Sequence, residues 1–463
     1  MTPTHSQKRG AQGLALLTMA LASCTIDVPP PDQYSDPDAI TDVAAARALL
    51  TSCYQLFPHY EYELSTLGDD YCPTNVSNRD VEQQNLYLWQ ERSINDLAAS
   101  VWIAYYNCIA VTDVLLHRMA SVRAPTPAEA EERAAIEAEG KTLKALCYFD
   151  LLRLFASPYG AAGDDAGVVV KVATGVETLP RSSKREVVEM IRNLLGDAVE
   201  AGSQPERNGW LSARAARLLM ADVSLYAGDM ASARENALAV VAQCDAAFIS
   251  GTNYSRLWSA DSWAGRIFAF HTSSAFMAGI QYSATEGDYF ALNPAFTFAE
   301  GDARAEWAVA EREMAGSARR LVGKYNKVNK EGGTNAYICR LRWAHAYFIA
   351  AEAQARQGDT GGALATLNAY LTAVGAEPLT ATGSADEMAA AIVAEKRKEF
   401  AGEGQNYFDI KRTGVPLERL GTWGGTRSTI RPDDFRRTFP IPASEYRYNE
   451  MVRQNEGWRA INN

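Results

Sequence analysis

The feature that most constrains the fold is an internal repeat, in which residues 216–241 resemble residues 346–371 at an offset of 130. Small residues and a Gly-Asp step recur: Ala216, Ala221, Gly228, Asp229 and Ala233 are answered by Ala346, Ala351, Gly358, Asp359 and Ala363. Small residues allow two antiparallel helices to approach closely, and Gly-Asp supplies a tight turn between them. The repeat therefore predicts two helix pairs of the tetratricopeptide-like kind.

Helix pairs of this kind bury their apolar faces only by stacking on neighbouring pairs. We therefore expect further, more degenerate units around residues 98–155 and 181–200. Residues 128–156 fit this, because an Ala- and Glu-rich opening continues into an apolar stripe that ends just before Pro158 and Gly160. The predicted fold class is all-α, with few short strands.

Residues 248–300 differ in composition from the helical segments, because they contain many aromatic residues among Ser, Gly, Asn and Thr. Because helical periodicity is lost there, we expect short strands and loops. This region is the predicted irregular, ligand-facing part of the chain. We divide the globular part into residues 41–245 and residues 246–463, packed as one unit.

The N-terminus reads as a lipoprotein signal peptide. Lys8 and Arg9 precede an apolar run, residues 13–22, that is too short to span a bilayer, and small residues then precede Cys24. We expect removal of residues 1–23, acylation of Cys24 and a proline-rich lipidated tether over residues 24–40.

Beyond this segment we expect no membrane-spanning helix, so attachment would rest on acyl chains alone. The formal net charge of the 463-residue chain is −11, and loss of Lys8 and Arg9 takes it to −13. Such a surface repels phosphate backbones, and no long Lys/Arg run offsets it. Nucleic acid is therefore not an expected partner.

Six cysteines remain after Cys24, and no two have the CxxC spacing of a zinc or redox site. Cys108 and Cys147 lie in apolar helical patterns, which predict buried free thiols. The sequence leaves the pairing of the others open, and we expect neither a metal site nor a cofactor.

The motifs of common hydrolases are missing from the sequence. There is no HExxH or GxSxG, and Gly140-Lys141-Thr142 lacks the first glycine of a phosphate loop. The neighbouring acids Asp69-Asp70 and Asp164-Asp165 do not by themselves give the separation of a glycosidase pair, so a solvated or helix-capping role is favoured. The chain is predicted not to be an enzyme.

Charges are dense near the C-terminus, after a helix that opens with the capping sequence from Ser384 to Glu387. Their signs alternate, which favours a network of ion pairs that pins this turn to the helix pairs. The six residues are Glu395, Arg397, Glu399, Glu403, Asp409 and Arg412.

The sequence resembles the SusD/RagB family of Bacteroidetes outer-membrane nutrient-binding lipoproteins. Three segments carry the likeness: residues 347–368, residues 395–414, and a tail of Phe439, Pro440, Ile441, Pro442, Glu445, Asn449, Gln454, Asn455, Glu456, Gly457 and Trp458. The chain departs from the usual pattern at Asn406, where an Arg is common, and at Glu456, where a Pro is common.

The resemblance implies a SusD-like fold with an irregular, loop-rich ligand face. It also implies an outer-membrane, lipid-anchored location facing the cell exterior and a SusC-like TonB-dependent transporter as partner. Family members mostly bind oligosaccharides, and some serve peptide uptake.

Exposed aromatic residues beside hydrogen-bonding side chains suit a sugar, because a sugar presents a flat C–H face edged by hydroxyls. The candidate ligand-binding residues are Tyr71, Asn75, Asn78, Arg79, Trp258, Trp263, Tyr282 and Tyr289. We assign four other aromatic residues to helix packing: Trp102, Tyr105, Tyr148 and Trp343.

The sequence thus predicts a cell-surface lipoprotein for nutrient uptake in polysaccharide utilization, which captures a glycan and delivers it to the transporter. One alternative is a peptide-binding uptake lipoprotein, which would bind an extended backbone. A second is a helical-repeat scaffold without a small-molecule ligand.

Overall fold

The computed structural model describes residues 40–73, 81–161, 165–204, 209–259, 263–271, 290–314, 316–324, 337–419 and 428–459. Contacts divide the chain into residues 1–39 and residues 40–463, and the described residues all lie in the second unit. Cys24 and the tether therefore lie outside the described residues.

The N-terminal half is built from helices and one short strand. Their bounds are α1 Val43–Leu56, α2 Glu61–Leu67, β1 Tyr71–Pro73, α3 Val81–Tyr87, α4 Glu91–Arg118, α5 Pro127–Phe155, α6 Lys184–Ala201, α7 Ala213–Tyr226 and α8 Met230–Val241. The two helices of the first repeat, α7 and α8, are consecutive in the chain.

The C-terminal half mixes helices with short strands. It holds α9 Ala246–Ile249, α10 Arg256–Ser259, β2 Arg266–His271, β3 Phe290–Leu292, α12 Ala303–Ala308, β4 Val309–Met314, β5 Ser317–Val322, β6 Tyr337–Arg342, α14 Trp343–Arg356, α15 Thr360–Ala373, α16 Ala385–Glu399, α17 Asn406–Thr413, β7 Leu417–Arg419, β8 Ser428–Ile430 and α18 Ala443–Tyr448. The strands of the described part pair as four antiparallel two-stranded ladders, β1–β3, β2–β6, β4–β5 and β7–β8. The predicted all-α class with few short strands is confirmed.

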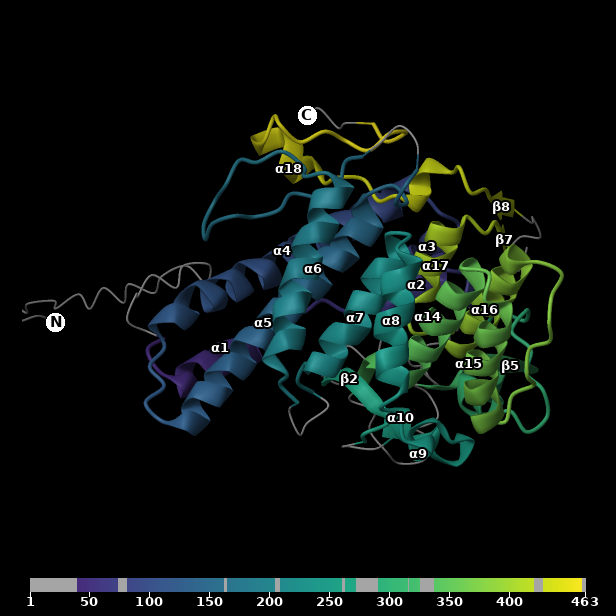
Figure 1. Ribbon diagram of the computed structural model, residues 1–463. Coiled ribbons are helices and arrows are strands. Elements are labelled where there is room, and N and C mark those ends of the chain that lie inside the picture. The colour runs from purple at the N-terminus through teal and green to yellow at the C-terminus, as the bar shows by residue number, and fades with distance from the viewer. Residues whose placement is uncertain are drawn as a thin grey trace, which may run out of the picture. The chain divides into compact units, whose positions relative to one another are not determined.

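The helices stack in chain order. Helices α4 to α8 lie side by side in Figure 1, and α14, α15 and α16 continue the array. The array closes up across a long insertion, because α8 packs directly on α14 although about a hundred residues separate them in the chain. Each pair thus covers the apolar face of the next, as the repeat predicts.

The repeat is confirmed at its turns. Gly228 and Gly358 have positive φ angles of 79° and 85°, a region that glycine enters without steric cost. The aspartate that follows each glycine caps the second helix, since Asp229 accepts from the Ser232 N–H and Asp359 from the Gly362 N–H. The same two residues therefore end one helix and start the next in both pairs.

Helix α5 confirms the long helix expected over residues 128–156. The Thr126 side chain and Glu129 form a reciprocal capping box at its start. The four aromatic residues assigned to packing are all buried: Trp102, Tyr105, Tyr148 and Trp343. Tyr105 donates to the buried Asp150, so its hydroxyl is satisfied inside the core.

One helix of the described part, running from Glu91 to Ser121, is long and apolar enough to cross a membrane by length and composition alone. We expected no later segment to reach the apolar length of a membrane span, and on length and composition alone that expectation was wrong. This helix buries Trp102, Tyr105 and Ile109 and packs against α1 and α5, which is the setting of a core helix.

The aromatic region forms strands β2 and β3, as expected, and also two short helices, α9 and α10, that the sequence did not indicate. Its rings build a second hydrophobic core with α14, α15 and α16. Trp258 stacks on Trp307 with ring centroids 6.4 Å apart and an interplanar angle of 12°. Much of the aromatic content is therefore structural.

Asp69 and Asp70 join the N-terminal half to the C-terminal block. Both are buried, so the expected solvated or helix-capping role was wrong. The Asp70 carboxylate accepts from the Gly402 N–H at 2.9 Å and from Asn406 Nδ2 at 2.6 Å. The Asn406 amide thus provides a hydrogen-bond donor to the buried Asp70 carboxylate.

The turn between the paired helices gives a test of the repeat. Gly358→Ala should lower the free energy of unfolding by about 1 kcal/mol, because only φ and no neighbouring atom opposes the new Cβ. Gly361→Ala is the matched control, since Gly361 lies in α15 with open space around it and alanine should stabilise by up to about 1 kcal/mol. Urea denaturation measures both, and equal effects would contradict the account.

Asp70 gives a pH test of the junction. Burial raises the pKa of Asp70 from 3.8 to about 7, so the folded chain holds this proton more tightly than the unfolded chain does. The free energy of unfolding should therefore fall as the pH rises from about 4 to about 7.

Asp70→Asn should remove this part of the slope in urea denaturation curves recorded across that pH range. Asp433→Asn, at an exposed carboxylate, should keep the slope of the natural chain. An unchanged slope in Asp70→Asn would show that the carboxylate stays ionised in the fold.

Candidate functional site

The β1–β3 ladder pairs two residues, Pro73 and Phe290, that adjoin predicted binding segments in the sequence. Pro73 pairs with Phe290 in antiparallel register, so the chain leaves β1 where it enters β3. Residues 74–80 and 272–289, which adjoin this end, lie outside the described residues, as do the candidates Asn75, Asn78, Arg79, Tyr282 and Tyr289. Their roles in binding stay predictions, but their attachment points are neighbours.

A cavity of about 530 Å³ opens beside this ladder. Its lining comes from four parts of the chain: Asp69; Asn293, Ala295, Phe296 and Thr297 after β3; Ala394, Arg397 and Lys398 on α16; and Pro416, Leu417 and Glu418 at β7. The volume is in the range of small-molecule sites. Phe296 and Leu417 are apolar parts of the lining, and its polar side chains offer hydrogen-bond donors and acceptors.

The floor of the cavity is rigid. Asn293 donates from Nδ2 to the Asp69 carbonyl at 2.8 Å, and its N–H donates to the Asp70 carbonyl at 2.9 Å. The buried Arg419 bridges the Asp69 carboxylate at 3.0 Å and the Leu67 carbonyl at 2.8 Å. These bonds fix β1, β3 and β7 around one turn, so the lining does not depend on a single loop.

Helix α16 supplies the charged wall. Ser384 caps the helix by accepting from the Glu387 N–H, which confirms that part of the predicted capping sequence. One face of α16 buries Met388, Ile392 and Val393, and a different face turns Ala394 and Arg397 to the cavity. The helix is therefore both a core element and a wall of the site.

Five of the six C-terminal charges form the predicted network. Arg304 pairs with Glu395, Arg342 with Glu399 and Glu403, and Arg412 with Glu352 and Asp409. Burial alone would raise the pKa of Glu399, but Arg342 and Arg304 hold it at about 2. The block is thus pinned to β6 and α14 by buried ion pairs.

Arg397 is the exception among the six. In the described part of the chain its guanidinium makes no ion pair, and its one hydrogen bond runs from Nη2 to the Gly68 carbonyl at 3.4 Å. Its Nε is buried without a partner. Sequence spacing gave no sign of this, because alternating charges do not tell which residue faces a cavity.

The aromatic candidates in the described residues are not open platforms. Trp258 is 0% exposed and Tyr71 is 3% exposed, so neither presents a ring face to solvent. Trp263 is half-buried, and the Arg256 guanidinium lies 3.8 Å from the centre of its ring. A ligand role for these residues stays a prediction, and none of them lines the 530 Å³ cavity.

Phe296, Asn293 and Thr297 are lining residues that we did not select from the sequence. The only signal for them is their place in the aromatic region, directly after β3. Pairing of β3 with β1, about 220 residues earlier, decides that they meet Asp69 and α16. Such pairing has no signature in a single sequence.

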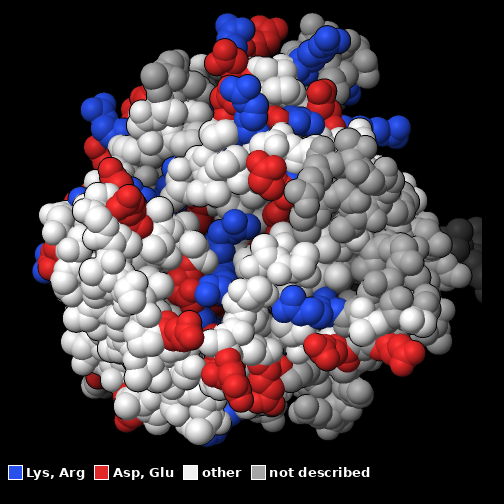
Figure 2. Space-filling view, turned by 90° about the vertical axis from the view of Figure 1, so that its right-hand side faces the viewer, with Lys and Arg blue, Asp and Glu red and all other residues white. Residues whose placement is uncertain are grey.

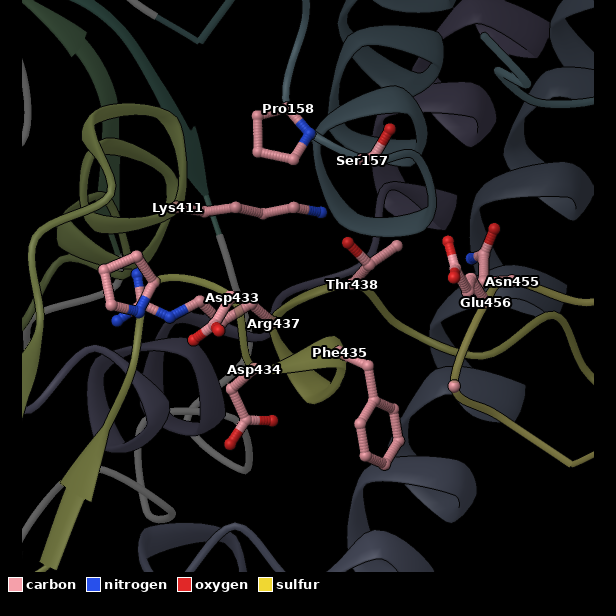
Figure 3. Close-up of a pocket in the computed structure, with 12 residues that line it drawn as sticks. Ser157, Pro158, Lys411, Asp433, Asp434, Phe435, Arg437, Thr438, Asn455 and Glu456 are labelled. Carbon is pink, nitrogen blue, oxygen red and sulfur yellow. The ribbon is translucent and has the colours of Figure 1, made fainter. Parts of the chain in front are cut away.

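Another cavity, of about 400 Å³, lies under the C-terminal tail (Figure 3). Lys411 extends across it toward Ser157 and Pro158, and its Nζ donates to the carbonyls of Leu154 and Ala156 at 3.1 and 2.7 Å. These carbonyls end α5 and have no partner within the helix. The lysine therefore caps a helix.

The other polar groups of this cavity are used in the same way. Arg437 donates to the carbonyls of Val415 and Ile430, and Asn455 Nδ2 donates to those of Phe155 and Phe439. The cavity under the tail thus holds the chain together, and we take the 530 Å³ cavity as the candidate site.

Figure 2 shows the side of the molecule on which α16 and β7 lie. Lysine and arginine side chains gather in a hollow near the middle of this face, with acidic side chains around them. A hollow of mixed charge suits a polar ligand with many hydrogen-bonding groups.

The cysteines in the described residues are all free: Cys53, Cys72, Cys108, Cys147, Cys244 and Cys339. Cys108 and Cys147 are buried, as predicted, and burial raises the pKa of Cys147. Within the described residues no group of three His, Cys, Asp or Glu side chains is placed to hold a metal ion.

One family of known proteins matches part of the chain in sequence. Residues 310–458 match the model of the SusD family. No curated protein matches the chain in sequence.

Several solved structures share the fold over most of the chain. A putative sugar binding protein from Bacteroides vulgatus superposes with a TM-score of 0.76 at 20% identity, over 91% of this chain and 100% of that one. A SusD superfamily protein from Bacteroides thetaiotaomicron gives 0.73 at 22% identity, over 89% and 99%. A laminarin binding SusD-like protein gives 0.67 at 20% identity, over 90% and 100%.

These matches agree with the architecture. The family model covers β4 to the tail, which includes the second repeat and the buried ion pairs, and the shared fold extends over the helices before it. The resemblance to the SusD/RagB family is therefore confirmed: residues 310–458 match the SusD family, and the chain shares the fold of SusD-like proteins over most of its length.

Proposed function

We propose that this protein is a cell-surface lipoprotein that binds an oligosaccharide and delivers it, unaltered, to a SusC-like TonB-dependent transporter in the outer membrane. The observation that carries the proposal is the 530 Å³ cavity in a SusD-like fold, with an aromatic wall and fixed polar groups. The similar proteins named as sugar binding and laminarin binding support the ligand class.

The site suits binding without chemistry. Its carboxylates are Asp69, which is bound to Arg419, and Glu418 at the exposed strand edge, where it accepts from Thr429. A glycosidase needs one carboxylic acid and one carboxylate on either side of the bond. Burial raises the pKa of Asp69, but its side chain is buried and bound to Arg419, so it is not placed to reach a glycosidic bond. Capture followed by release fits this donor and acceptor set better than hydrolysis.

A block in the cavity tests the binding role. Ala394 is exposed on α16 and lines the cavity, so Ala394→Trp should fill the space and weaken oligosaccharide binding by at least about tenfold. Ala365→Trp is the matched control, because Ala365 is exposed on α15 and is not part of the lining. A glycan array identifies a ligand for the purified protein, and calorimetry measures its affinity.

If Ala394→Trp binds the oligosaccharide as tightly as the natural protein does, the binding site does not lie in this cavity. If peptides bind and no glycan does, the peptide-uptake alternative replaces the proposal. If neither binds while a partner protein does, the scaffold alternative holds.

The lipid anchor has its own test. Cys24→Ser should abolish incorporation of labelled palmitate and release the protein from the membrane fraction, because the signal peptide predicts Cys24 as the acylated residue. Cys244→Ser, at a half-buried thiol, should leave the label in place. Palmitate incorporation into Cys24→Ser would contradict the assignment.

A further inference from the structure

Arg397 has an unusual setting for an arginine in this fold. It lines the candidate cavity and is half-buried, so part of its guanidinium is away from water. Its Nε is buried without an acceptor, and within the described residues no carboxylate lies within ion-pair distance. A buried donor without a partner is uncommon and costly, and it is often completed by a ligand.

Neighbouring arginines differ from Arg397 in their ion pairs, although Arg304 and Arg419 also bury one nitrogen without an acceptor. Arg304, Arg342, Arg412 and Arg419 are each bound to at least one carboxylate. Two other buried cations of the C-terminal region, Lys411 and Arg437, lack a carboxylate but give their donors to backbone carbonyls that end or join elements of the fold. Arg397 differs from both sets, because it has no ion pair in the described residues, makes one long hydrogen bond and lines the cavity.

The remaining charges of the cavity largely cancel. Asp69 is paired with Arg419, and Lys398 is paired with Glu395. Glu418 is exposed at the edge of β7, where water screens it. Arg397 adds a positive charge that no ion pair of the described residues neutralises, although it lies near enough to Asp69 and Asp70 to favour their ionised forms.

The guanidinium is also held in position. Its carbon lies 5.8 Å from the centre of the Phe296 ring, and Nη2 reaches the Gly68 carbonyl. A planar guanidinium with free N–H groups matches an oxyanion with two oxygens, such as a carboxylate or a sulfate.

We propose that the oligosaccharide taken by this site carries an acidic group, a carboxylate or a sulfate, and that Arg397 binds it. The inference rests on the proposed function and names its substrate class. The hydroxyls of the same sugar would form hydrogen bonds with Asn293, Thr297 and the edge of β7, and the sugar ring would pack against Phe296.

The experiment compares three oligosaccharides of equal length and the same parent sugar: an oligogalacturonide, a sulfated galacto-oligosaccharide and a neutral galacto-oligosaccharide. Calorimetry on the purified protein should show at least one acidic ligand bound about tenfold or more tightly than the neutral one, and added salt should reduce the difference. Preference between the two acidic ligands identifies the group.

Variants assign the preference to one residue. Arg397→Gln should lose about 10- to 100-fold in affinity for the acidic ligand and keep its affinity for the neutral one. Arg397→Lys should retain part of the preference for the acidic ligand. Lysine keeps the positive charge but cannot donate to two oxygens at once as the planar guanidinium does. Arg92→Gln, at a side chain that is 94% exposed on α4, is the control and should bind as the natural protein does.

The outcomes separate this inference from the proposed function. A natural protein that binds neutral glycans and not acidic ones leaves the proposed function standing and overturns the role of Arg397. Equal loss of acidic and neutral binding in Arg397→Gln also overturns it. Binding of peptides and of no saccharide overturns both, and thermal unfolding confirms that each variant is folded.

Discussion

Buried ion pairs around Arg342 hold the fold together. This arginine is the last residue of strand β6. It binds Glu399, which ends α16, and Glu403, which lies in the turn to α17. Lys324, after β5, adds a second cation to Glu403 at 2.6 Å. Loss of one partner from such a cluster leaves an uncompensated buried charge and costs about 3–5 kcal/mol. The same turn supplies Gly402 and Asn406 to Asp70, so the cluster also fixes β1 and the floor of the cavity.

The structure divides the charged residues of α16 between fold and function. Glu395 and Glu399 point into the ion-pair network, while Arg397, between them in sequence, lies at the cavity with an unpaired Nε. A helix turns about 100° per residue, so neighbours in sequence face different surroundings. In the cavity under the tail, by contrast, Lys411 donates to carbonyls at the end of α5 and so serves the fold.

The sequence predicted the helical array well and the site only in part. The turn residues Gly228 and Gly358 could be recognised because left-handed backbone and helix capping are local demands. Trp258 could not be placed, because its burial depends on stacking with Trp307 from a later segment. Phe296 and Arg397 were missed as site residues for the same reason, since the cavity exists only once β1 pairs with β3 and α16 packs beside them. Long-range pairing decides which polar residues are free, and one sequence does not encode that in any local pattern.

We propose that the saccharide site lies between the β1–β3 ladder, α16 and β7. Hydrogen exchange of the protein with and without its bound oligosaccharide tests this most directly. The account predicts that protection rises at residues 68–73, 290–297, 394–398 and 416–418 and stays unchanged around Lys411 and the tail. Protection confined to the tail cavity, with no change at those four segments, would contradict it.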